Sequence, residues 1–167
     1  MSHSEHIILT HQEIQHKTRR IAYQIYESNV NEKELIIAGI VQNGFTFAKR
    51  IAAILEEISP IQIQLCEVSM NKKAPLHTVK TSLQPSDYQN KSIILIDDVL
   101  HSGTSLIYGV HHFLNVPLTR FKTAVLVNRN HKKFPIKADF KGISLSTSIN
   151  EHVQVYFEPK NDRAVLE

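Results

Sequence analysis

The sequence has a single cysteine and no long apolar run. The lone Cys66 cannot form an intrachain disulfide, which is typical of a reducing compartment. Every apolar run is far shorter than the roughly 20 residues of a membrane helix, and residues 1–20 lack the apolar core of a signal peptide. No repeat, low-complexity tract or Gly/Ser linker divides the chain. We therefore expect one cytoplasmic domain over residues 1–167.

The composition is that of an ordinary folded domain with a slight excess of positive charge. With 42% hydrophobic and 21% charged residues, the chain lies outside the compositional range of disordered proteins. Its 19 basic and 16 acidic residues give a net charge of +3, which suits anionic substrates or a modest contact with nucleic acid, although ordinary surface lysines would also produce it. The basic residues considered for RNA binding form two groups: Lys17, Arg19 and Arg20, and Arg129, Lys132, Lys133 and Lys137.

Apolar periodicity predicts helices that alternate with strands. Thr10 and Glu13 have the spacing of a capping box ahead of a helical pattern over residues 11–28. The other predicted elements are helices over 45–57 and 104–114, and strands over 35–41, 61–68, 93–96, 121–127 and 153–157. Residues 70–91 are predicted to form a long loop, with a possible short strand at 78–83. The alternation predicts an α/β fold with a mostly parallel, twisted sheet flanked by helices, and a ligand site beyond the carboxyl ends of the strands.

The segment with the clearest chemistry is Ile93–Ser105. Its apolar run ends in the adjacent carboxylates Asp97 and Asp98, whose repulsion and desolvation cost free energy unless a cation or hydroxyl donors compensate. The small residues of Ser102–Ser105 then combine a flexible glycine with hydroxyl side chains at the start of a helix, where backbone N–H groups and the helix dipole attract anions. Two acids for sugar hydroxyls or a metal, followed at once by a phosphate-binding turn, indicate a site for a ribose 5-phosphate.

Residues 93–105 resemble the signature with which type I phosphoribosyltransferases bind phosphoribosyl pyrophosphate (PRPP). The resemblance implies the fold of that family, in which a small hood accompanies the main sheet. It also implies that Asp97 and Asp98 contact the ribose hydroxyls and hold Mg²⁺, largely through substrate and water. The same resemblance implies that the 5′-phosphate lies against the loop that follows: His101, Ser102, Gly103, Thr104 and Ser105.

Over nearly its whole length the chain resembles one branch of this family, the PyrR-type pyrimidine-operon attenuators that are also uracil phosphoribosyltransferases. Stretches that carry the likeness include Ile7–Asn29, Gly44–Ile51, Ala124–His131 and Pro135–Phe140. The branch implies transfer of uracil onto PRPP to form a nucleoside monophosphate, and a homodimer or higher oligomer. Further residues with implied roles are Asn43 and Gly44 at the pyrophosphate, and Val127, Asn128 and Arg129 near the base.

The chain departs from the family pattern at three places. The pyrophosphate turn reads Gln42-Asn43-Gly44, where the family usually offers a basic residue. The flexible loop reads Glu67–Lys73 where the family normally has a strand that ends in Tyr-Arg-Asp, and Lys72 or Lys73 is a candidate for the missing charge, without the bidentate fork of arginine. His101 stands where the PyrR branch has tyrosine. Near neutral pH it could serve as acid or base, and a role limited to shaping the loop is equally compatible.

Two alternatives to a uracil phosphoribosyltransferase stay open. One is a nucleotide-sensing regulator of transcription attenuation that binds RNA through the two basic groups and has weak or no catalysis. The other is a transferase for a purine base (hypoxanthine, guanine or xanthine), because base choice depends on a few contacts. A metal site at His111 and His112 is disfavoured, since adjacent helical residues point in different directions.

Overall fold

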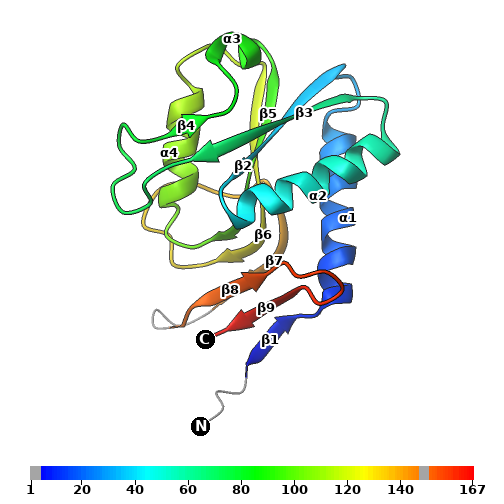
Figure 1. The fold of residues 1–167 in the computed structure, drawn as a ribbon, viewed down its shortest axis with the longest axis vertical. Coiled ribbons are helices and arrows are strands. Elements are labelled where there is room, and N and C mark those ends of the chain that lie inside the picture. The colour runs from blue at the N-terminus through cyan, green and yellow to red at the C-terminus, as the bar shows by residue number, and fades with distance from the viewer. Residues whose placement is uncertain (1–4, 147–150) are drawn as a thin grey trace.

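The computed structural model describes residues 5–146 and 151–167, which form two sheets and the helices that cover the larger one (Figure 1). The elements are β1 His6–Leu9, α1 His11–Ser28, β2 Glu34–Ile40, α2 Asn43–Ile58, β3 Gln62–Ser69, β4 Lys80–Thr81, α3 Pro85–Tyr88, β5 Ser92–Leu100, α4 Thr104–Phe113, β6 Arg120–Arg129, β7 Phe140–Leu145, β8 Val153–Tyr156 and β9 Arg163–Leu166. None of the helices in the described residues is long and apolar enough to cross a membrane.

The main sheet has the strand order β4-β3-β2-β5-β6-β7. All neighbouring strands are parallel except the short β4, which runs antiparallel to β3. The prediction of an α/β fold with a mostly parallel sheet flanked by helices is therefore confirmed. The order changes direction between β2 and β5, because β2 connects outward to β3 while β5 connects outward to β6 on the other side. Such a switch point opens a crevice at the carboxyl ends of the strands.

The sheet is buried on both faces, and each of its central strands β2, β5 and β6 contains a continuous apolar run. In β5, Ile94 and Ile96 point to the face covered by α1 and α2, whereas Ile93 and Leu95 pack with α3 and α4 on the opposite face. Continuous apolar runs of this kind are typical of strands in parallel sheets covered by helices on both sides. The two helical layers thus fix the sheet, and with it the positions of the strand ends.

A second, three-stranded antiparallel sheet of order β1-β9-β8 lies below the carboxyl end of the main sheet in Figure 1. We call this sheet the hood. It joins segments from the two ends of the chain, since β1 pairs with β9. The sequence predicted β8, but the four-residue strands β1 and β9 are too short to give a recognisable alternation.

Local sequence signals placed most of the other elements correctly. α1 begins with the predicted capping box, in which Thr10 Oγ1 accepts the Glu13 N–H at 3.3 Å and Glu13 Oε1 accepts the Thr10 N–H at 3.1 Å. β5 is longer than predicted and includes the acidic pair, because β6 continues to pair beside it as far as Leu100 and Asn128. β7 was missed because Gly142 is its only buried residue, so no apolar run marks this edge strand.

Candidate active site

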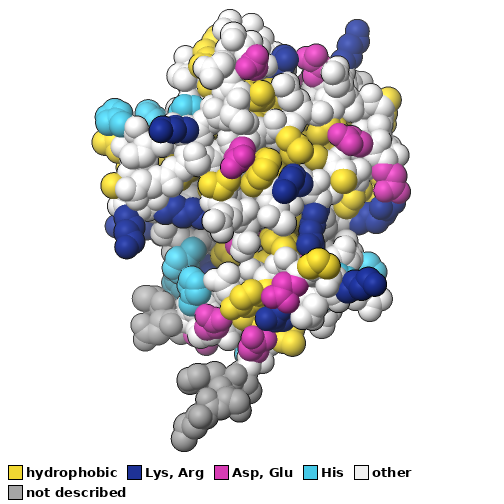
Figure 2. All heavy atoms as spheres, in the orientation of Figure 1, with side chains coloured by type: hydrophobic (Ala, Val, Ile, Leu, Met, Phe, Trp, Pro, Cys, Tyr) yellow, Lys and Arg dark blue, Asp and Glu magenta, His cyan; other side chains and the backbone are white. Residues whose placement is uncertain are grey.

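A cavity of about 620 Å³ lies at the switch point between β2 and β5. β2 pairs with β5 only as far as Ile96, so the two strands part where the acidic pair begins. The cavity is lined by Val41, Gln42, Asn43, Lys72, Asp97, Asp98, Val99, His101, Ser105, Arg129, His152, Val153 and Gln154. These residues come from the main sheet, the long loop after β3 and the hood. Figure 2 shows histidine side chains gathered where the hood meets the main sheet.

The two carboxylates at the end of β5 have different environments. Asp97 is buried, with 5% of its surface exposed, whereas Asp98 is half-buried. Asp97 Oδ1 accepts the backbone N–H of Asp98 at 2.9 Å, and Asp98 Oδ1 accepts that of Val99 at 2.8 Å. Burial, followed by the charge of Asp98, raises the pKa of Asp97 well above its ordinary value, and the ammonium of Lys72 opposes this rise. A proton or a cation is therefore favoured at this pair.

The turn between β2 and α2 brings backbone against the acidic pair. A Cβ atom added to Gly44 would lie 2.9 Å from both Asp97 Oδ1 and Ile96 O, so only glycine allows this approach. The side chain of Asn43 faces the cavity, where its Nδ2 donates to Asp98 Oδ2 at 3.1 Å and to the backbone oxygen of Val155 in β8 at 2.8 Å. Asn43 thus connects the pyrophosphate turn expected from the sequence with the acidic pair and the hood.

The loop between β5 and α4 closes tightly around Gly103. This residue has φ 89°, and a Cβ atom there would lie 2.4 Å from Ile136 Cγ2, so a larger residue would be both strained and obstructed. The Ser102 and Thr104 hydroxyl oxygens lie 2.8 Å apart. A small cavity of about 60 Å³ is lined by Asp97 and by Val99–Leu106, and it shares residues with the larger cavity. The N-terminus of α4 lies at this small cavity, where the Thr104 N–H donates to Ser102 Oγ at 3.3 Å.

Arg129 is buried at the end of β6, with 1% of its surface exposed, and holds two other parts of the cavity wall. Its Nη1 donates to His101 Nδ1 at 2.8 Å and its Nη2 donates to the backbone oxygen of Glu151 at 2.5 Å. Because Nδ1 of His101 accepts this bond, the ring carries its proton on Nε2. Burial, then the charges of Arg129, His152 and His131, lower the pKa of His101, which keeps the imidazole neutral near pH 7.

The structure brings together most of the residues expected to form the site. Asn43, Asp97, Asp98, His101, Ser105 and Arg129 line the large cavity, and Ser102, Gly103 and Thr104 line the small one. The three residues expected near the base do not all line the cavity, however. Val127 lies in the hydrophobic core, and Asn128 is buried with its Nδ2 donating to Ser144 Oγ at 3.2 Å, so only Arg129 of that group lines the cavity.

Of the two lysines considered for the missing charge, Lys72 lines the cavity and Lys73 does not.

Three cavity residues were not expected from the sequence. His152, Val153 and Gln154 of the hood complete the cavity, although nothing in the local sequence marks them as functional. They follow the main sheet in sequence, and only the pairing of β8 with β9 places them opposite the acidic pair.

The basic residues considered for RNA binding do not form one uniform surface. Arg129 is buried inside the cavity wall. Arg19 pairs with Glu57 at 3.5 Å, and Arg20 Nη2 donates to the backbone oxygen of Gly142 at 2.7 Å, which attaches α1 to β7. Lys132 and Lys133 are exposed beside the loop between β5 and α4, where the Lys133 N–H donates to Ser102 O at 2.8 Å. On the face drawn in Figure 2, Lys and Arg are interspersed with Asp and Glu.

Comparison with known proteins agrees with this fold. Residues 4–160 match the family described as the phosphoribosyl transferase domain. The chain therefore belongs to the phosphoribosyltransferase family. It is 34% identical over 163 residues to a protein named bifunctional protein PyrR of Limosilactobacillus reuteri, covering 92% of each chain. It is 31% identical to the PyrR of Chloroflexus aurantiacus, covering 91% of this chain and 88% of that protein. The predicted resemblance to the PyrR branch is confirmed.

Solved structures of the family share the fold at low sequence identity. A hypoxanthine phosphoribosyltransferase of Trypanosoma cruzi matches 99% of this chain and 93% of its own, with a TM-score of 0.78 and 15% identity. A hypoxanthine-guanine phosphoribosyltransferase of Bacillus anthracis matches 97% of this chain and 99% of its own, with a TM-score of 0.73 and 19% identity. At these identities the likeness establishes the arrangement of the elements and leaves the bound base to be argued from the site.

Proposed function

We propose that this chain is a phosphoribosyltransferase that joins uracil to PRPP and releases a nucleoside monophosphate and pyrophosphate. The observation that carries the proposal is that three features meet at one switch point: the adjacent carboxylates Asp97 and Asp98, the N-terminus of α4, and the closely packed backbone of the turn at Gly44. A phosphorylated sugar needs these three partners along its length. The PyrR proteins that the chain resembles support uracil as the base.

Each part of the cavity has a role in this reaction. Asp97 and Asp98 accept hydrogen bonds from the ribose hydroxyls, and the 5′-phosphate occupies the loop Ser102–Ser105 at the N-terminus of α4. The turn at Asn43 and Gly44 presents backbone to the pyrophosphate. Lys72 supplies a cation on that side of the cavity. Arg129 and His101 meet the base together with the hood.

Catalysis consists of holding the two reactants and stabilising charge on the leaving group. The bond between ribose C1 and a pyrophosphate oxygen breaks, a bond from C1 to the base nitrogen forms, and the proton of that nitrogen leaves to water or to the released pyrophosphate. Negative charge grows on pyrophosphate as the sugar becomes cationic, so Lys72 stabilises the leaving group. His101 Nδ1 already accepts an N–H from Arg129, so the ring offers its Nε2–H to the cavity. We infer that His101 orients the base by donating a hydrogen bond.

The acidic pair also fits a magnesium ion. Two adjacent carboxylates, one of them with a raised pKa, gain from a nearby cation, and Mg²⁺ binds with one or two protein carboxylates while substrate oxygens and water complete its octahedron. Asp97 and Asp98 would hold it in that way. When bound, the ion neutralises charge on the pyrophosphate.

The proposal is tested by incubating purified protein with PRPP, Mg²⁺ and single bases, and measuring pyrophosphate release. Turnover with uracil is expected. Turnover restricted to hypoxanthine, guanine or xanthine would move the specificity to purines, which the solved structures above act on. Absence of turnover with every base would reject the catalytic proposal.

A second candidate function is RNA-binding transcription attenuation controlled by a nucleotide in the same cavity. It is favoured by the exposed Lys132 and Lys133, whose segment contacts the phosphate loop through the Lys133 N–H. A phosphate bound in the loop would therefore change the position of the segment that carries these two lysines. The test is binding of a structured leader RNA at increasing salt, with and without uridine monophosphate (UMP). Exchange of Lys132 and Lys133 for glutamine should weaken binding, and unchanged affinity would reject this role.

A further inference from the structure

One face of α2 carries three side chains that contact the hood. Asn43, Phe47 and Arg50 follow one another at helical spacing, so they lie on the same side of the helix. Asn43 donates to the backbone oxygen of Val155 at 2.8 Å. The ring of Phe47 stacks with that of Phe157 at a centroid distance of 5.9 Å, and the guanidinium of Arg50 lies 4.7 Å from the same ring. The hood is therefore attached along the N-terminal half of α2.

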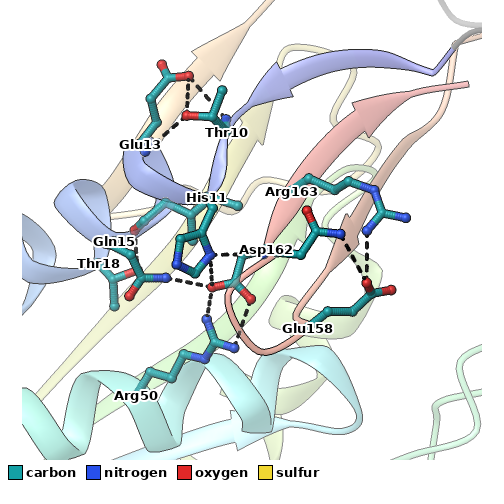
Figure 3. Close-up of polar contacts among 11 residues, drawn as sticks. Thr10, His11, Glu13, Gln15, Thr18, Arg50, Glu158, Asp162 and Arg163 are labelled. Carbon is teal, nitrogen blue, oxygen red and sulfur yellow. Dashed lines mark hydrogen bonds and ion pairs between the residues drawn. The ribbon is translucent and has the colours of Figure 1, made fainter.

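A further contact is an ion pair between Arg50, whose side chain is 29% exposed, and the buried Asp162 (Figure 3). Only 2% of Asp162 is exposed. Arg50 meets both carboxylate oxygens, with Nη2 3.0 Å from Oδ1 and Nη1 bonded to Oδ2. Gln15 Nε2 donates to Oδ2 at 2.6 Å, and the Asp162 N–H donates to His11 Nδ1 at 3.0 Å. Asp162 thus joins the segment between β8 and β9 to α1 and α2 at once.

A second ion pair from the same segment makes no such connection. Glu158 Oε2 lies 3.2 Å from Arg163 Nη1, and both residues belong to the hood or to the turn within it (Figure 3). The Glu158 side chain is 50% exposed, whereas that of Asp162 is 1% exposed. Exposed pairs contribute little, while a bidentate buried pair fixes geometry. The two pairs lie close together (Figure 3), but they differ in burial and in whether they connect the hood to the helices of the main sheet.

We propose that Arg50 and Asp162 are positioning residues that set the distance of β8 from the acidic pair and thereby determine how tightly the cavity holds a nucleobase. β8 supplies Val153 and Gln154 to the cavity, and Phe157 follows this strand directly. The proposed ribose and phosphate partners lie at the end of β5 and the start of α4, outside the hood. Loss of the ion pair between Arg50 and Asp162, which we call the clamp, should therefore weaken contacts to the base and spare those to the sugar phosphate. The proposal rests on the proposed function, in which the cavity binds a nucleotide.

The test compares UMP, which has a base, with ribose 5-phosphate, which lacks one, by titration calorimetry. Asp162→Asn removes the charge without changing the size of the side chain. It should weaken UMP binding about tenfold and change ribose 5-phosphate binding less than about twofold. The control Glu158→Gln should change neither. Arg50→Lys, which keeps the charge without the fork, should fall between wild type and Asp162→Asn. Equal weakening of both ligands, or an Asp162→Asn variant that behaves like the control, would overturn the proposal.

A readout independent of ligands separates this inference from the function on which it rests. Backbone amides of residues 153–156 should exchange with solvent faster in Asp162→Asn, while those of 93–96 in β5 keep their protection. If wild type binds neither ligand, the proposed function fails and exchange alone decides whether the clamp holds β8. Unchanged exchange at 153–156 would reject the clamp in either case. Should Asp162→Asn fold poorly, the double variant Arg50→Gln with Asp162→Asn keeps a neutral hydrogen-bonding pair for the same measurements.

Discussion

The cavity has two walls that are built in different ways. The sheet wall consists of the ends of β5 and β6 and the start of α4, and its acidic pair and phosphate loop follow one another within Ile93–Ser105. The hood wall consists of His152, Val153 and Gln154, which reach the cavity only because β8 pairs with β9 and docks on α2. One wall is local in sequence, and the other depends on contacts between distant segments.

This difference matches a division of labour in the proposed reaction. The ribose phosphate is the same for every base, and a rigid strand end with a glycine turn suits a constant ligand. The base is the variable part, and it lies toward a small sheet whose position depends on a few side chains such as Asn43 and Arg50. The sheet wall should therefore control whether any nucleotide binds, while the hood wall should control which nucleotide binds. Each prediction below sharpens or breaks that contrast.

The largest effect is expected from the double variant Asp97→Asn with Asp98→Asn in the sheet wall. It should lower kcat/KM for PRPP by about a thousandfold or more, because the ribose loses its acceptors and the site loses its cation partner. Binding of ribose 5-phosphate should be lost as well. Steady-state kinetics and calorimetry measure the two effects. The thermal midpoint should not fall, since the variant removes repulsion between like charges. Activity within about tenfold of wild type would contradict the assignment of this wall.

A smaller effect is expected at Lys72, which belongs to neither wall. Lys72→Ala should raise KM for PRPP about tenfold, because the pyrophosphate loses a cationic contact. Ribose 5-phosphate lacks pyrophosphate, so its affinity should stay unchanged. The matched control is Lys73→Ala, since Lys73 is the next residue and does not line the cavity. Equal effects of the two variants would mean that only the overall charge of the loop matters.

The same contrast explains what the sequence could predict. Local patterns mark helix α1, the strands β2, β3, β5 and β6, and the loop between β5 and α4. Examples are the capping box of Thr10 and Glu13 and the glycine turn at Gly103. The hood could not be predicted in this way, because its pairing and its clamp at Asp162 join residues from both ends of the chain. Val127 was placed in the base pocket from its position at a strand end, but its side chain is fully buried in the hydrophobic core beside that of Leu126.

The hood wall should show a weaker and more selective effect at His152. This side chain is exposed, and its backbone is held by hydrogen bonds with Glu167 of 2.9 and 2.8 Å, so His152→Ala should leave the fold intact. KM for uracil should rise about threefold while KM for PRPP stays unchanged, because only the contact with the base is lost. Kinetics with each substrate varied in turn provide the measurement. A parallel rise in both KM values would mean that the two walls do not act separately.

The smallest effect concerns stability, and it tests whether the buried carboxylate of the sheet wall is held under electrostatic stress. The pKa of Asp97 is raised in the folded state by burial and by Asp98, so the fold favours the protonated acid. Below the ordinary pKa of 3.8, Asp97 is protonated in both the folded and the unfolded chain. As the pH rises from there through the raised pKa, the unfolded chain ionises first and the folded state loses stability.

The stability of Asp97→Asn should therefore depend on pH only through the other titratable groups, which it shares with wild type. It should lack the loss of stability that ionisation of Asp97 causes. The gap in free energy of unfolding between the variant and wild type should grow in favour of the variant above pH 3.8 and level off once Asp97 is ionised in both states. Urea denaturation between about pH 3 and about pH 8 measures the gap. The gap should be smaller when both proteins also carry Asp98→Asn, because the charge of Asp98 contributes to the raised pKa of Asp97. Parallel curves of unfolding free energy against pH for Asp97→Asn and wild type would show that the fold does not raise the pKa of Asp97. The sheet wall would then hold its carboxylates without an electrostatic cost.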